Sequence, residues 1–98
     1  MLLAHAVTLA EARSYLAALA DTALSFDASV EYERVLLQLD FLHGDFIPGI
    51  SRVPAYTRDV LLDVANAAIE ELTEHGIDLL SVELLLDMLE VAWSKDLP

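Results

Sequence analysis

The stretch DLLSVELLLDMLEVAW, residues 78–93, decides the fold. Its acidic residues Glu83, Asp87 and Glu90 recur at spacings of four and three, so in a helix they form one narrow polar stripe. Nearly every other position is Leu, Val, Met or Ala. A helix with so wide an apolar surface must be covered over most of its circumference, which predicts that other helices pack against it.

Two helices are expected in the first half of the chain. Thr8 and Glu11 have the spacing of a capping box, in which each side chain satisfies a backbone N–H of the first turn, and this predicts a helix over about residues 9–24. Its many alanines permit close helix contact. A second helix should end near Gly44. Three residues compete as the N-cap of this second helix: Ser25, Asp27 and Ser29.

A third helix, the longest, is expected between Pro54 and Gly76. Proline suits the first helical turn, where its missing N–H costs nothing, and glycine suits the left-handed position after the last turn. The segment 44–54 holds two of the three glycines and two of the three prolines, so it should form the one substantial loop. Asp78 or Ser81 is expected to cap the final helix.

These helices indicate an all-α protein, folded as one compact four-helix bundle over residues 1–98. No alternation of period two argues for a strand. The two short links, and the longer Pro/Gly-containing loop between helices 2 and 3, favour an up-and-down arrangement.

The composition describes a strongly acidic chain with much apolar surface. Of its 98 residues 56% are hydrophobic, and the mean hydropathy is +0.50. A domain of this size cannot hide so many apolar side chains, so some of them are expected to meet a partner. The formal charge of -12 opposes binding to nucleic acid or to an anionic membrane surface.

The residue types exclude several further classes of protein. The chain has no cysteine, so it offers no disulfide, thiol nucleophile or thiolate metal site. Charged residues interrupt every apolar run before it reaches the ~20 residues that a membrane span requires, and no basic start marks a signal peptide. We therefore expect a protein outside the membrane, with the cytoplasm as its default location.

Residues 43–49, HGDFIPG, resemble the catalytic-loop string of aminoglycoside and choline phosphotransferases. The resemblance implies that Asp45 serves as a base and that a nearby Asn holds magnesium. Ile50 stands where that Asn is needed, no Gly-rich phosphate loop exists, and a chain this short cannot supply a nucleotide-binding lobe. The string is therefore interpreted as a chance match, and no enzymatic activity is predicted.

Two residue pairs have a spacing that metal ligands use. Asp40 with His43, and Glu71 with His75, would each share one helical face. A metal centre in a bundle usually needs several carboxylates and two histidines that point inward, and His75 near a helix end is explained by its interaction with the helix dipole. No metal and no cofactor are predicted.

Seven residues are candidates for binding a partner: Asp59, Asp63, Glu70 and Glu74 in an acidic ladder that also includes Asn66, and Asp45, Phe46 and Ile47 in the loop. The ladder is either a solvated face or an electrostatic surface that meets basic residues. The loop residues either cover the end of the bundle as core or project as apolar anchors. Trp93 is either core or an interface residue.

The leading hypothesis is a non-enzymatic, acidic helical binding protein that neutralises a basic protein partner, as an immunity protein, an antitoxin or an inhibitor of a nuclease does. It depends on the size and charge of the chain. The alternative is a homodimeric structural or assembly module that buries the 79–93 helix against its twin, with the acidity serving only solubility.

Overall fold

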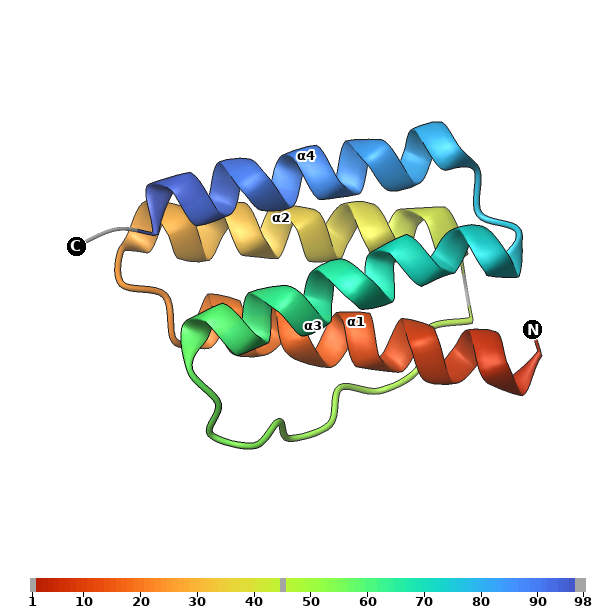
Figure 1. The fold of residues 1–98 in the computed structure, drawn as a ribbon, viewed down its shortest axis with the longest axis horizontal. Helices are drawn as coiled ribbons and strands as arrows, with labels where there is room; N and C mark the ends of the chain where they lie inside the picture. The colour runs from red at the N-terminus through yellow and green to blue at the C-terminus, as the bar shows by residue number, and fades with distance from the viewer. Residues whose placement is uncertain (1, 45, 97–98) are drawn as a thin grey trace.

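Four α-helices build the fold in the computed structural model, which describes residues 2–44 and 46–96 (Figure 1). They are α1 (Leu3–Asp21), α2 (Phe26–His43), α3 (Arg58–Glu71) and α4 (Leu79–Lys95), and a short 3-10 helix, η1 (Leu72–His75), follows α3 directly. No strand occurs in either described range, and the expected all-α four-helix bundle is confirmed.

The helices do not simply alternate in direction, because α2 and α3 run the same way (Figure 1). Arg58 at the start of α3 donates to the carbonyl of Thr22, just past the end of α1. At the other end of the bundle, Thr8 near the start of α1 donates to Glu71 at the end of α3. α1 is therefore antiparallel to α3 as well as to α2, and the expected up-and-down order is wrong between the second and third helices.

The connection 44–57 makes this order possible, because it can run the full length of the bundle. An extended chain advances about 3.3 Å per residue, whereas a helix advances about 1.5 Å. The loop follows the outside of α1 in the direction of α1 (Figure 1). Arg13 ties it to α1 by donating to the carbonyl of Pro48, and the N–H of Ser51 donates to Ser14 Oγ at 3.0 Å.

Three helix-end predictions are confirmed. Of the candidate caps for α2, Ser25 is the one used, and its hydroxyl accepts from the N–H of Ala28 at 3.1 Å. Asp78 caps α4 by accepting from the N–H of Ser81 at 3.2 Å. Gly76 has φ +89° just past η1, the left-handed conformation that glycine adopts at low cost.

Two predicted helix starts are wrong. α1 begins at Leu3, so Thr8 lies inside the helix, and its hydroxyl donates across the bundle to Glu71 at 2.5 Å instead of capping. α3 begins at Arg58 rather than at Pro54, because the N–H of Tyr56 closes a tight turn onto the Pro54 carbonyl at 2.7 Å, so α3, with 14 residues, is shorter than α1, α2 and α4 and is not the longest helix. In both places a cap-like residue stands near a helix without starting it.

Apolar residues of all four helices and of η1 form one buried cluster. α1 and α3 share the most extensive contact, and the buried alanines Ala12, Ala65 and Ala68 on these two helices leave room for a close approach. α2 packs against both α1 and α4. α3 and α4, by contrast, contact each other sparsely.

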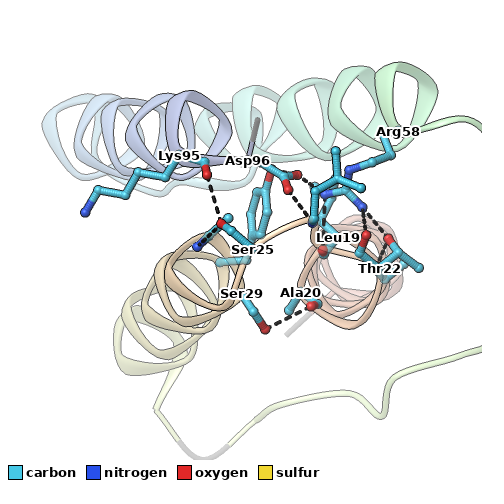
Figure 2. Close-up of polar contacts among 12 residues, drawn as sticks. Leu19, Ala20, Thr22, Ser25, Ser29, Arg58, Lys95 and Asp96 are labelled. Carbon is cyan, nitrogen blue, oxygen red and sulfur yellow. Dashed lines mark hydrogen bonds and ion pairs between the residues drawn. The ribbon is translucent and has the colours of Figure 1, made fainter. Parts of the chain in front are cut away.

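The end of the bundle where α4 stops is held by a buried carboxylate, Asp96 (Figure 2). It accepts from the Tyr32 hydroxyl at 2.8 Å and from the N–H of Leu24 at 2.7 Å, and it pairs with Arg58, which also donates to the Leu19 carbonyl. Burial raises the pKa of Tyr32 above its ordinary value, and the hydrogen bond to Asp96 raises it further. Tyr32 is therefore a neutral donor at physiological pH, and the network joins α2, α3 and α4 to the turn after α1.

Candidate functional site

An open groove of about 310 Å³ lies between α3 and α4. Its lining residues are Leu62, Asn66 and Glu70 from α3, and Leu86, Asp87, Leu89, Glu90 and Trp93 from α4. The apolar members form a leucine and tryptophan floor, and the acidic members stand on both helices. A segment with an apolar stripe flanked by basic side chains has the matching chemistry.

The carboxylates of the groove have no ion-pair partner among residues 2–44 and 46–96. Four of the five basic residues pair elsewhere: Arg13 with Asp40, Arg34 and Lys95 with Glu31, and Arg58 with Asp96. Glu70, Asp87 and Glu90 are all exposed. Their negative charge is therefore not compensated within the described structure and can act on a partner.

The predicted acidic ladder lies on α3 and η1, and its four carboxylates are exposed. Only Glu70 lines the groove, together with the amide of Asn66. Asp59 and Asp63 continue the same stripe toward the start of α3, since they precede these residues at helical spacing. Glu74 lies in η1 and faces a different cavity, which it shares with His75.

The predicted loop residues are not part of the groove. Phe46 is 72% exposed and Ile47 is 38% exposed. Both lie near the start of the loop between α2 and α3, which runs alongside α1 (Figure 1). Of the two alternatives for this loop, the exposure of Phe46 contradicts a core position for that residue, whereas Val53 further along packs against the core. Asp45 lies outside the described residues.

Much of the apolar excess lies exposed on the outer faces of α2 and α4. Leu80, Leu84 and Val91 of α4 are exposed at spacings of four and seven, beside the acidic stripe. On α2, Leu37 and Phe41 are exposed in the same way. Within residues 2–44 and 46–96, no helix has both the length and the apolar content that a membrane span needs.

All three histidines of the chain meet at one end of the bundle, although they come from different helices. His5 lies in the first turns of α1, His43 ends α2, and His75 ends η1. The Nε2 atoms of His5 and His43 are 3.0 Å apart. The ring of His75 stacks on that of His5, with 5.2 Å between the centroids. The sequence-based prediction did not include His5.

The hydrogen bonds define which ring nitrogens carry protons. His43 Nδ1 is 2.8 Å from the Leu39 carbonyl, which can only accept, so Nδ1 carries a hydrogen, and in the neutral form of the ring Nε2 has a free lone pair. His5 Nε2 then donates to His43 Nε2. Burial lowers the pKa of His5, and the neighbouring His43 and His75 lower it further, so the neutral imidazole is favoured.

In the two residue pairs with metal-ligand spacing, both carboxylates accept hydrogen bonds from other side chains. Asp40 accepts from Arg13 at 2.8 Å, and Glu71 accepts from Thr8. In the part of the chain that the structure describes, no three His, Asp or Glu side chains are placed so that they could hold a metal ion as they stand.

No family model matches the chain, and neither the curated proteins nor the solved structures contain a match. Within the string HGDFIPG, His43 ends α2 and residues 46–49 lie in the loop.

Proposed function

We propose that the chain is a non-enzymatic binding protein that neutralises a basic protein partner, in the manner of an immunity protein, an antitoxin or another protein inhibitor. The groove between α3 and α4 is the proposed contact surface, and a cytoplasmic location belongs to the proposal. One observation carries it: an apolar floor lies between two helices whose carboxylates have no ion-pair partner in the described ranges.

The acidic groups have two separate roles in this proposal. Glu70, Asp87 and Glu90 line the groove and would pair with Lys or Arg side chains as a partner excludes water. Asp59 and Asp63 lie on the same stripe outside the groove, and together with the net charge of -12 they would speed the encounter without close contact. Phe46 and Ile47 form a second, separate candidate contact.

Trp93 gives a direct test, because it is the only tryptophan of the chain and it lines the groove. The probe is a synthetic amphipathic helix with a leucine stripe between Lys and Arg residues. Its binding should change the Trp93 fluorescence. The triple variant Glu70→Lys, Asp87→Lys and Glu90→Lys should weaken binding roughly 10–100-fold at low salt, since three attractive contacts become repulsive.

The matched control is a triple variant at exposed acids of α1 and α2: Glu11→Lys, Asp21→Lys and Glu33→Lys. It changes the formal charge by the same amount but leaves the groove intact, so affinity should fall only slightly. Equal losses of affinity in both triple variants would mean that the attraction depends on net charge alone. That result would contradict the groove as the contact surface. Neutralisation itself is tested with a basic protein that the immobilised chain retains at low salt. The activity of that protein should be lost on addition of the unmodified chain but not on addition of the groove variant.

A homodimeric assembly module remains the second candidate, because Leu80 is 72% exposed and Leu84 and Val91 continue the same apolar stripe of α4. Light scattering after size-exclusion chromatography tests it. A dimer is expected to dissociate in the double variant Leu80→Lys and Leu84→Lys, and dissociation should lower thermal stability. A monomer at every concentration would exclude this candidate.

A further inference from the structure

We propose that His5, His43 and His75 form a binding site for a divalent transition-metal ion such as Zn²⁺. His5 and His43 supply two ligands through their Nε2 atoms. His75 becomes the third when its ring turns from Thr8 toward the ion, and water takes the remaining position. This site lies apart from the groove, whose lining residues include no histidine.

The first two ligands already have nearly the required separation. Zinc–nitrogen bonds of about 2.0–2.1 Å place two tetrahedral ligand atoms about 3.3 Å apart. His5 Nε2 and His43 Nε2 are 3.0 Å apart. Without metal this contact is a hydrogen bond. When the proton of His5 moves through solvent from Nε2 to Nδ1, the ring stays neutral and both Nε2 lone pairs become available to the ion.

His43 has the supporting contact that metal-binding histidines usually have. Its Nδ1–H donates to the Leu39 carbonyl at 2.8 Å, within the same helix. A hydrogen bond of this kind holds the ring in one orientation and keeps the lone pair on the other nitrogen. His43 therefore needs no change of tautomer to bind an ion.

His75 is close enough to complete the site and is only weakly held in its present position. Its ring stacks on His5 with 5.2 Å between the centroids, and its Nε2 has a long contact of 3.3 Å to Thr8 Oγ1. The stronger hydrogen bond of Thr8, to Glu71, does not depend on His75. A cavity of about 360 Å³ lined by Leu2, His5, Glu74 and His75 gives the ring room to turn, and the Glu74 carboxylate favours a cation there.

Calorimetric titration of the untagged chain with Zn²⁺ tests the proposal. We expect one high-affinity ion per chain, and each of His5→Ala, His43→Ala and His75→Ala should lower the Zn²⁺ affinity at least about tenfold. Because these are all the histidines of the chain, their ring signals in NMR spectra should all shift on Zn²⁺ addition. Zn²⁺ should also raise the melting temperature of the unmodified chain but of none of the variants.

Two controls separate this site from binding by the acidic surface. Mg²⁺, which prefers oxygen ligands, should not shift the histidine signals, and Glu83→Gln, at an exposed carboxylate of α4, should leave the Zn²⁺ affinity unchanged. Circular dichroism of the metal-free variants shows whether each is folded, and a glutamine variant replaces any alanine variant that is not. Unchanged Zn²⁺ affinity in folded variants of any one histidine overturns the three-histidine site, as does the absence of Zn²⁺ binding.

Discussion

Replacing Asp96 with alanine is expected to lower the free energy of unfolding by about 3–5 kcal/mol. The carboxylate is buried, pairs with Arg58, and accepts hydrogen bonds from Tyr32 and from the N–H of Leu24. Its removal leaves the guanidinium of Arg58, which is itself largely buried, without a counter-ion. It also leaves the Tyr32 hydroxyl without an acceptor in a buried position. Urea unfolding followed by circular dichroism measures the loss.

The neighbouring residue provides the control for this experiment. Lys95 pairs with Glu31 at 3.3 Å on the surface, so Lys95→Ala should cost only about 0–1 kcal/mol. Similar losses in the Lys95 and Asp96 variants would mean that the last turn of α4 frays in either case. That result would contradict a specific role for the buried carboxylate.

Leu39→Ala is expected to lower the free energy of unfolding by about 2–5 kcal/mol, because it removes a fully buried side chain and leaves a cavity in the core. Leu37→Ala is the matched substitution, on the same helix and at the same residue type, but 68% of Leu37 is exposed. Its effect should lie within about 0.5 kcal/mol of zero. Urea unfolding at low protein concentration measures both variants.

The same pair of variants also bears on self-association. A concentration-dependent loss in Leu37→Ala would mean that a second copy covers the outer face of α2. A loss in Leu37→Ala as large as that in Leu39→Ala at every concentration would contradict the placement of α2 in the bundle.

Helix content and the helix ends at Ser25, Gly76 and Asp78 could be predicted because they depend on residues that are close in the sequence. Ser25, Asp78 and Gly76 each act on a backbone group within a few positions. The direction of α3 could not be predicted in this way. It depends on where the loop docks, through contacts such as that between Ser51 and Ser14, which are far apart in the sequence.

The candidate sites were predictable only in part, for the same reason. The acidic stripes of the third and fourth helices follow from helical spacing, but the groove between them depends on how sparsely α3 and α4 pack. The histidine cluster depends directly on topology. In an up-and-down bundle the first and third helices are parallel. The end of the third helix then lies at the other end of the bundle from the start of the first, so His75 would be far from His5. The reversed α3 brings the two rings together.

The sparse contact between α3 and α4 also affects how the chain is made. α3 packs mainly against α1, and α4 packs mainly against α2. The hairpin formed by α3 and α4 therefore has few internal contacts to stabilise it alone. During synthesis α1 and α2 leave the ribosome first and must wait, with an apolar surface open, until the last helix has emerged. The first hairpin then serves as the template on which the second assembles, and the nascent chain is most vulnerable to aggregation until α4 has emerged and packed against α2.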